Sequence, residues 1–199
     1  MSTLPHSAAA ERNQQPILAA LLRILPPRGT ALEIASGTGQ HVVAFAAALK
    51  DWIWQPTEHD AAMLPVIRSR IAQTGLDNVR PPLLLDVTAS PWPLVERFDA
   101  IFCANMLHIS PWKACAGLMH GAAAHLAPDG LLITYGPYFE HDVLPAPSNV
   151  AFDQSLRARD PEWGVRHLDA VASQARQAGL VLAQRHEMPA NNLLLVFRR

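Results

Sequence analysis

The chain has 199 residues, half of them hydrophobic, and a formal net charge of −1 at pH 7. This length and composition fit one globular domain with its own core and exclude a disordered chain. The near-zero charge provides no basic stripe of the kind that nucleic-acid-binding domains display, so we expect no nucleic-acid partner.

Three further sequence features bear on compartment and metals. The N-terminus has no basic stretch followed by an apolar segment, and no run reaches the roughly 18 apolar residues of a membrane span. Cys103 and Cys115 each lie in an apolar segment, which favours buried thiols in a reducing compartment over a disulfide. The histidines have no cysteine partners and no His-Glu-x-x-His spacing, so no metal site is expected. We therefore expect a cytoplasmic protein without membrane contact.

Apolar runs alternate with helical stretches along the chain, which is typical of parallel strands joined by crossover helices. Helices are predicted over residues 8–24, 40–49, 60–74, 112–126 and 167–178, and strands over 30–35, 52–57, 80–86, 98–104 and 130–135. Two final strands, 180–187 and 192–198, are joined by so short a link that they must form an antiparallel hairpin. Residues 138–164 are predicted to be an irregular insertion, long enough to act as a lid. The whole of 1–199 is expected to form a single α/β domain.

Residues 33–41, Glu-Ile-Ala-Ser-Gly-Thr-Gly-Gln-His, join the first predicted strand to a helix. Gly37 and Gly39 let the backbone pass close to a ligand, and the helix N-terminus beyond them suits an anionic group. A dinucleotide-binding turn requires glycine or alanine where this chain has Val42, which argues against an NAD-dependent oxidoreductase. Glu33 would repel a pyrophosphate but attract an ammonium, such as that of S-adenosylmethionine. The alternative for Glu33 is a helix cap or a partner of an arginine.

Polar side chains follow the next three predicted strands, where a doubly wound sheet binds its ligands. Glu58 is placed to accept hydrogen bonds from ribose hydroxyls, and Asp60 is the alternative acceptor. Asp86 is placed to accept from an adenine amino group, with Val87 beside it, and Asn105 follows the fourth strand. One of the first two acids could instead cap the following helix, and Asp86 could be a solvated loop acid.

His108 is the candidate general base, because histidine titrates near neutrality. The alternative is a histidine hydrogen-bonded beneath the next loop. Methyl transfer requires a base only when the acceptor starts protonated, so a pocket without a catalytic residue is also chemically sufficient. Met106 and Leu107, just before it, are expected to be packing residues.

The acceptor side of such a site is expected to come from the N-terminal helix, the start of the helix after the fourth strand, and the insertion. Packing or solvation is the alternative for each candidate. The candidates are Asn13, Gln14, Trp112, Tyr135, Tyr138, Ser148, Asn149, Arg157 and Trp163.

Longer segments spread over the chain resemble one known family. They are Glu-Arg-Asn-x-x-Pro-Ile-Leu at 11–18, the glycine turn at 33–41, Trp-Gln-Pro at 54–56, Phe-Cys-Ala-Asn-Met-Leu-His-Ile-Ser-Pro-Trp at 102–112, Tyr-Gly-Pro-Tyr at 135–138, Ser-Leu-Arg-Ala-Arg-Asp-Pro-Glu-Trp-Gly at 155–164 and Glu-Met-Pro-Ala-Asn-Asn-Leu at 187–193. Together they look like the methyltransferase-like 26 family, also called domain of unknown function 938.

The resemblance implies a Rossmann-like, doubly wound, seven-stranded sheet of five parallel strands and a C-terminal antiparallel hairpin, with helices on both faces. It also implies S-adenosylmethionine as cofactor and S-adenosylhomocysteine as product, but it supplies no substrate. It favours a cofactor set of Glu33, Gly37, Gly39, Glu58, Asp86 and Asn105. Ala35 departs from the glycine that is commonest at its position in class I methyltransferases, which a slight shift of the turn accommodates.

The leading hypothesis is thus an S-adenosylmethionine-dependent methyltransferase with a small-molecule acceptor. The Asn/Asp-Pro-Pro-aromatic motif of enzymes that methylate amino groups of nucleic acids is absent, because Met106 and Leu107 follow Asn105. A non-catalytic cofactor-binding or scaffolding protein with this fold is the alternative from a different class. The sequence does not determine the oligomeric state.

Overall fold

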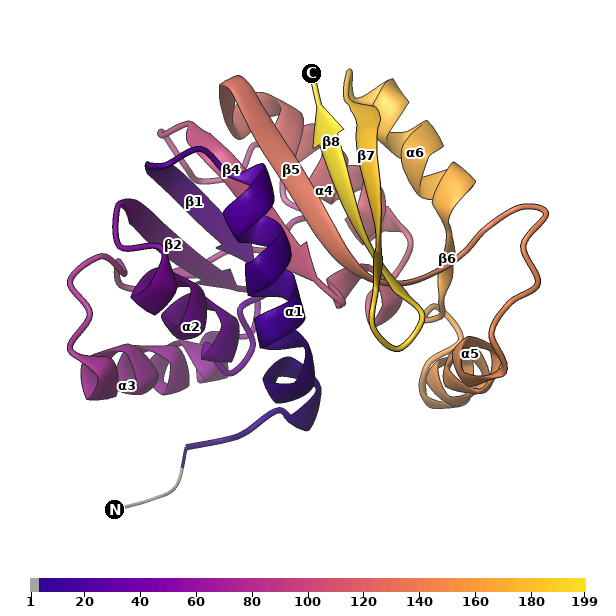
Figure 1. The fold of residues 1–199 in the computed structure, drawn as a ribbon, viewed down its shortest axis with the longest axis horizontal. Helices are drawn as coiled ribbons and strands as arrows, with labels where there is room; N and C mark the ends of the chain where they lie inside the picture. The colour runs from indigo at the N-terminus through magenta and orange to yellow at the C-terminus, as the bar shows by residue number, and fades with distance from the viewer. Residues whose placement is uncertain (1–3) are drawn as a thin grey trace.

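The predicted alternation of strands and helices folds into one mixed sheet, seen in a computed structural model that describes residues 4–199 (Figure 1). The first three residues of the expected domain lie outside the described residues. Within 4–199 the sheet has eight strands. Their order is β3 (Leu83–Leu84), β2 (Trp52–Glu58), β1 (Gly29–Ile34), β4 (Phe98–Ala104), β5 (Leu126–Phe139), β8 (Asn192–Arg198) and β7 (Val181–Met188), while β6 (Arg166–His167) pairs with β5 off this path.

The directions of the strands confirm the predicted arrangement of five parallel strands and a hairpin. β3, β2, β1, β4 and β5 pair in parallel, whereas β8 runs antiparallel to β5 and β7 antiparallel to β8. The eighth strand, β6, was not predicted, because two polar residues carry no periodic signal; it pairs in parallel with Tyr138 and Phe139 of β5.

Helices cover both faces of the sheet, as expected for buried parallel strands. The helical elements are α1 (Ala8–Ile24), α2 (Gln40–Ala48), the short η1 (Ala61–Met63), α3 (Leu64–Thr74), the short η2 (Met106–His108), α4 (Lys113–His125), α5 (Pro147–Arg159) and α6 (Leu168–Gln177). In Figure 1, α1 lies in front of the sheet and α4 behind it. None of the described helices is long and apolar enough to cross a membrane.

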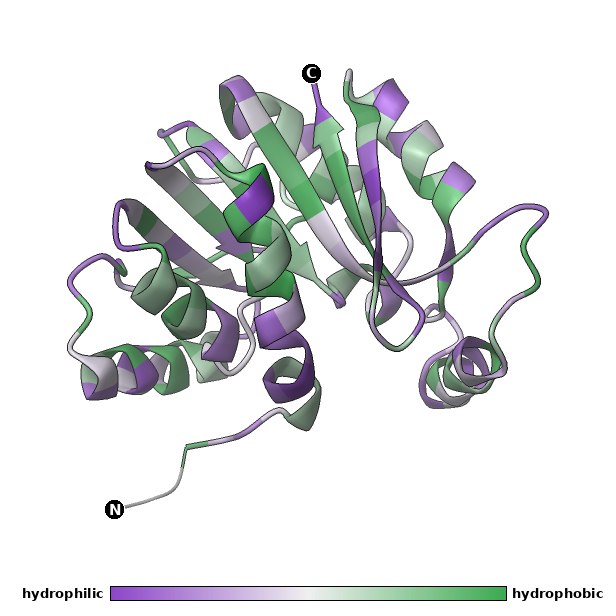
Figure 2. Ribbon diagram, in the orientation of Figure 1, coloured by the Kyte–Doolittle hydropathy of each residue, from purple (hydrophilic) through white to green (hydrophobic). Residues whose placement is uncertain are grey.

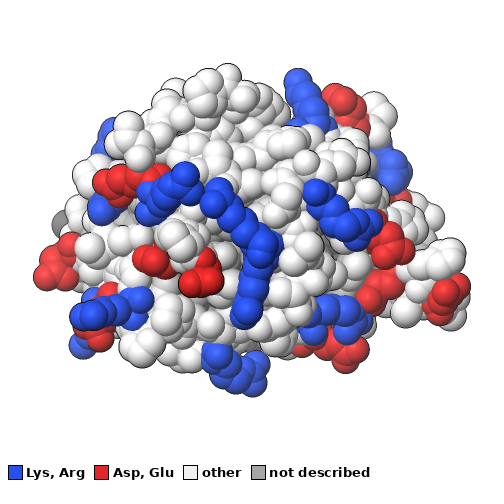
Figure 3. Space-filling model, turned by 90° about the horizontal axis from the view of Figure 1, so that it is seen from above, with Lys and Arg blue, Asp and Glu red and all other residues white. Residues whose placement is uncertain are grey.

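Alternate residues of β1 point into two separate hydrophobic clusters. Ala31 packs with residues of α1 and α2, whereas Leu32 and Ile34 pack with residues of α4 and α6. β5 and β8 carry long hydrophobic stretches through the middle of the domain (Figure 2). Charged side chains of both signs are interspersed on the surface drawn in Figure 3.

Two segments differ from the sequence predictions. The third strand shrinks from 80–86 to Leu83–Leu84, because Pro81 and Pro82 have no amide hydrogen for a sheet ladder. The insertion is not irregular: β5 continues to Phe139, and residues 147–159 form α5, with Pro147 in the first turn, where a missing amide hydrogen costs nothing.

Close contact between α4 and the segment after β3 sets the position of one candidate site wall. A Cβ atom on Gly117 would overlap the carbonyl oxygen of Val87, and one on Gly121 would overlap the indole of Trp92. Trp92 in turn donates a hydrogen bond from Nε1 to the Val87 oxygen at 3.1 Å. The two glycines therefore allow α4 to lie directly against the backbone that follows β3.

We expect Gly117→Ala to destabilise the protein although alanine is the better helix former. Overlap with a backbone oxygen costs more than the helix-propensity gain of about 1 kcal/mol, giving a net loss of about 1 to 2 kcal/mol. Urea unfolding at neutral pH measures it, with Ser69→Ala on the exposed side of α3 as control. A denaturation midpoint at or above that of the wild type would contradict the predicted contact.

Candidate functional site

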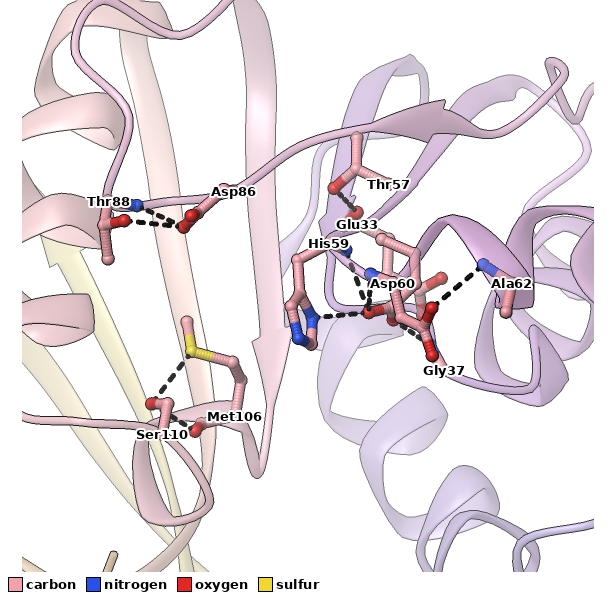
Figure 4. A network of polar contacts seen from close by, with 11 residues as sticks. Glu33, Gly37, Thr57, His59, Asp60, Ala62, Asp86, Thr88, Met106 and Ser110 are labelled. Carbon is pink, nitrogen blue, oxygen red and sulfur yellow. Dashed lines mark hydrogen bonds and ion pairs between the residues drawn. The ribbon is translucent and has the colours of Figure 1, made fainter. Parts of the chain in front are cut away.

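A cavity of about 520 Å³ opens at the carboxyl ends of the parallel strands. Its walls come from the glycine turn after β1, the end of β2 and the residues after it, residues 85–88 after β3, and Trp163 from the insertion. The end of β4 and the segment after it contribute Ala104, Met106, residues 109–111, Lys113 and Ala114. Figure 4 shows the first two of these walls facing the segments that carry Asp86 and Met106 across an open space. The volume lies within the range of about 300 to 1,000 Å³ that small-molecule sites occupy.

The structure brings most of the predicted cofactor residues to this one cavity. Ala35, Gly37, Glu58, Asp86 and Val87 all line it, and so does Asp60, the alternative ribose acceptor. They span positions 35 to 87 of the chain, and the strand order places them together. Glu33 and Asn105 adjoin lining residues but do not line the cavity themselves, and Gly39 does not line it either.

The glycine turn is built from left-handed backbone conformations. Ala35, Gly37 and Gly39 have φ values of 54°, 55° and 75°. The first is uncommon for a residue with a Cβ atom, which is the physical reason that glycine is favoured at that position. The turn is fixed to β2 by a hydrogen bond from the Ser36 amide to the Thr57 carbonyl oxygen at 2.8 Å.

Glu33 is a buried carboxyl group without a partner for one of its oxygens. The residue is 1% exposed, and its Oε2 atom has no hydrogen-bond partner among the described residues. Burial raises the pKa of Glu33 to about 8, and the nearby charge of Glu58 adds to the effect. Neither the helix cap nor the arginine pair considered for it is formed by the described residues. A cation arriving beside it would favour ionisation.

Glu58 joins the end of β2 to the glycine turn. Its Oε2 atom accepts from the Gly37 amide at 2.8 Å, and its Oε1 atom accepts from the His59 amide at 2.9 Å and lies 2.8 Å from His59 Nδ1. Asp60 instead accepts from the Ala62 amide at 2.9 Å, capping η1. The cap role considered for one of the two acids therefore belongs to Asp60, and Glu58 is the carboxylate fixed at the turn.

Asp86 fixes the turn after β3. Its Oδ1 atom accepts from both the amide and the hydroxyl of Thr88 at 2.8 Å. These hydrogen bonds lower the pKa of Asp86, with a smaller contribution from Lys113 across the cavity, so the group is ionised at neutral pH. Asp86 thus has an internal structural contact as well as a place in the cavity wall.

His108 lies behind the cavity wall. The residue is fully buried, and neither ring nitrogen has a hydrogen-bond partner among the described residues. Its ring packs edge-on against Tyr138 and occupies the space that a Cβ atom on Gly136 would need. Burial lowers the pKa of His108 to about 3, so the imidazole is neutral. It does not line the cavity, and its role as a base stays a prediction.

The acceptor candidates are not gathered around one cavity. Only Trp163 lines the main cavity, while Tyr138 and Asn149 line a second one of about 290 Å³ between β5, α5 and the turn of the β7–β8 hairpin. The other candidates make contacts elsewhere. Asn13 is hydrogen-bonded to His41 at 2.6 Å, Ser148 accepts a hydrogen bond from Asn191, and Arg157 forms an ion pair with Asp153 at 2.8 Å. Tyr135 packs in the core, the ring of Trp112 lies under the guanidinium of Arg166, and Gln14 is half-buried on α1. For Ser148, Asn149 and Arg157 the reason is that they lie on α5, which does not contribute to the wall of the main cavity.

Several cavity residues were missed by the sequence predictions. They include His59, Met63, Thr88, Lys113 and residues 109–111, and Met106, which was expected to be a packing residue, also lines the cavity. Ile109, Ser110 and Pro111 follow the predicted fourth strand closely, so their position in the chain was the available signal. No group of histidine, cysteine, aspartate or glutamate residues within 4–199 is placed to hold a metal ion.

A family model described as a protein of unknown function, DUF938, matches residues 4–199. The chain belongs to this family. The match bears out the expected domain of unknown function 938, whereas the relationship to methyltransferase-like 26 stays a prediction.

Solved structures similar to this DUF938 chain are longer methyltransferases. The mitomycin 7-O-methyltransferase MmcR matches with a TM-score of 0.84 at 18% identity, over 96% of this chain and 54% of MmcR. An O-methyltransferase family 2 protein from Planctomyces limnophilus, in complex with apigenin, gives 0.79 at 18% identity, over 96% and 60%. CalO1, a methyltransferase of calicheamicin biosynthesis in its SAH-bound form, gives 0.78 at 12% identity, over 95% and 54%.

These similarities establish the fold of the DUF938 chain, which is that of the methyltransferases. The chain spans little more than half the length of the three proteins. Their identity to it, at most 18%, is too low to carry over an activity.

We expect Glu33→Gln to change how stability depends on pH. Because the pKa of Glu33 is raised from 4.5 to about 8 on folding, the unfolded chain loses this proton first, and wild-type stability falls across that window by about 1.4 kcal/mol per pH unit. The glutamine amide does not titrate, so the variant lacks this fall in stability between pH 4.5 and pH 8. Urea unfolding should show variant and wild type alike near pH 5, and the variant more stable by a few kcal/mol at pH 8.

Ser69→Ala provides the control, since it changes an exposed side chain that carries no titratable group and should leave the pH dependence unchanged. A stability difference between Glu33→Gln and wild type that stays constant from pH 5 to pH 8 would show that Glu33 does not titrate in this window.

Proposed function

We propose that this protein is an S-adenosylmethionine-dependent methyltransferase acting on a small-molecule acceptor. The observation that carries the proposal is the buried, partly unpartnered Glu33 carboxyl beneath the glycine turn, next to a cavity whose walls hold Glu58 and Asp86. A buried acid in this state is stabilised by a cation that comes to it.

The three acids fit the three polar parts of that cofactor. Glu33 would hold the ammonium of the amino-acid part, Glu58 the ribose hydroxyls and Asp86 the adenine amino group. A dinucleotide fits less well, because its pyrophosphate would lie against Glu33 and because Val42 replaces the third small residue of the dinucleotide turn. Bound here, S-adenosylmethionine would supply an electrophilic methyl group on sulfur and leave as S-adenosylhomocysteine.

The chain's own part in such a reaction is to bind, orient and exclude water. The turns that carry the acids are fixed by hydrogen bonds to neighbouring backbone, so a ligand would meet a preformed site. His108 is neutral and therefore able to accept a proton, but an acceptor could reach it only after the residues that cover it had moved.

A small acceptor is favoured by the size of the cavity and by the mixed charge of the surface in Figure 3. Two of the similar structures, the mitomycin 7-O-methyltransferase and the complex with apigenin, also concern small molecules. A cofactor-binding protein without turnover is the second candidate, and it is kept because His108 does not line the cavity.

Calorimetric titration of the purified protein with S-adenosylmethionine and S-adenosylhomocysteine tests the proposal. We expect saturable binding by the wild type. Glu58→Gln and Asp86→Asn each remove charge-assisted hydrogen bonds, so each should weaken binding about 10- to 100-fold. Asp77→Asn, an exposed acid away from the cavity, serves as the matched control and should bind like the wild type.

Circular dichroism and thermal unfolding of each variant separate loss of binding from loss of fold. A well-folded, ligand-free wild type that binds neither compound would reject the proposal. Binding without methyl transfer to any compound of a metabolite extract would favour the non-catalytic alternative.

A further inference from the structure

Trp163 differs from the other four tryptophans of the chain in having no part in the hydrophobic core. Trp52, Trp54 and Trp92 are at most 3% exposed, and Trp112 packs against one of the two core clusters. Trp163 belongs to neither cluster, is half-buried, and lines the main cavity. A large aromatic side chain that stabilises no core and faces a cavity is placed to contact a ligand.

The backbone on both sides of Trp163 is held firmly. Its amide donates to the Asp160 carbonyl oxygen at 3.0 Å, and the next amide, of Gly164, donates to the His108 carbonyl oxygen at 2.9 Å. Gly164 has a φ of 153°, and a Cβ atom there would come within 2.7 Å of Asp153 Oδ1. Position 164 can therefore hold this conformation next to Asp153 only because it is glycine.

Arg166 then fastens this segment to the loop after β4. Its guanidinium donates to the carbonyl oxygens of Leu107 at 2.9 Å, Ser110 at 2.6 Å and Glu162 at 2.7 Å. The same loop places Met106 and Ile109 in the cavity wall. Trp163 is thus fixed relative to an apolar part of the cavity, in spite of coming from the insertion.

The indole of Trp163 is also held in place through its ring. The Arg159 guanidinium lies over the ring, 5.0 Å from its centroid, in a cation–π contact. A ring with its backbone and one face fixed loses little conformational freedom when a second flat molecule stacks on it.

The acids of the proposed function come from other parts of the wall. Glu58 ends β2 and Asp86 follows β3, at one edge of the sheet, whereas Trp163 comes from the insertion between β5 and β6. If the acids hold the adenosine part of a cofactor, the surface of Trp163, Met106 and Ile109 remains for a second molecule. Indole and thioether groups favour flat, polarisable partners.

We propose that Trp163 forms the binding surface for the methyl acceptor and that the acceptor is a flat, conjugated small molecule stacked on its indole. This inference rests on the proposed function and deepens it by naming the class of acceptor.

The test measures binding to protein saturated with S-adenosylhomocysteine, with naphthol as the flat probe and decalol, its saturated analogue, as the matched non-aromatic probe. The wild type should bind naphthol more tightly than decalol. Trp163→Ala should weaken naphthol binding roughly tenfold and remove the preference for naphthol over decalol. Trp163→Phe should keep most of the naphthol affinity and most of that preference. Phe152→Ala removes an exposed aromatic side chain of α5 that lies outside the cavity, and it should change neither affinity.

The titration of S-adenosylhomocysteine itself distinguishes failure of this inference from failure of the proposed function. Its affinity should be the same in wild type and Trp163→Ala. A tenfold loss of that affinity with naphthol binding unchanged would assign Trp163 to the adenine instead and overturn the inference. Equal binding of naphthol and decalol by the wild type, or no binding of either, would also overturn it, whereas failure of the cofactor product to bind would reject both proposals.

Discussion

The hydrogen bond from the Gly37 amide to the Glu58 carboxylate connects the two strands on which the site depends. It joins the turn after β1 to the end of β2 at 2.8 Å, in a place where Glu58 is only 4% exposed. Because the carboxylate also accepts from His59, it holds the turn and the start of the next segment in one arrangement. The charge of Glu58 then contributes to keeping Glu33 protonated, so the geometry of the turn and the electrostatics of the site have a common origin.

The glycine turn contains energetically unfavourable features that the surrounding structure has to stabilise. Ala35 is held in a left-handed conformation, and Glu33 and Ser36 each have a buried polar atom for which residues 4–199 offer no hydrogen-bond partner. Such features cost of order 1 to 3 kcal/mol each and persist where the surrounding structure determines them. Here the support is the sheet itself, since β1 lies between β2 and β4 and is buried on both faces. A site whose buried polar atoms lack hydrogen-bond partners, and whose backbone is held by the sheet, is suited to a ligand that supplies those partners.

The insertion has two parts, which contact different regions of the protein. The start of α5 lies at the hairpin turn, where Asn149 donates to the Asn191 carbonyl oxygen at 2.9 Å and Ser148 accepts from the Asn191 side chain. The last residues before β6 lie next to the main cavity, and Trp163 forms part of its wall. Arg166 stabilises the segment that carries Trp163 by donating hydrogen bonds to three carbonyl oxygens, those of Leu107, Ser110 and Glu162. Specificity in this protein would therefore depend on a short, rigid segment, not on the whole insertion.

Local sequence patterns determined the fold class, the helix over 8–24, the strand over 98–104 and the glycine turn, because apolar periodicity and glycine act through near neighbours in the chain. They also located Glu58 and Asp86, since strand ends in a parallel sheet meet at one edge. Only the tertiary structure shows that Asp60 caps η1 while Glu58 accepts from the Gly37 amide, because these contacts join segments that are distant in the chain or depend on the backbone geometry of the turn. It likewise decided that His108 is enclosed and that Trp163 lies in the cavity wall, because both outcomes depend on contacts between segments more than 25 residues apart.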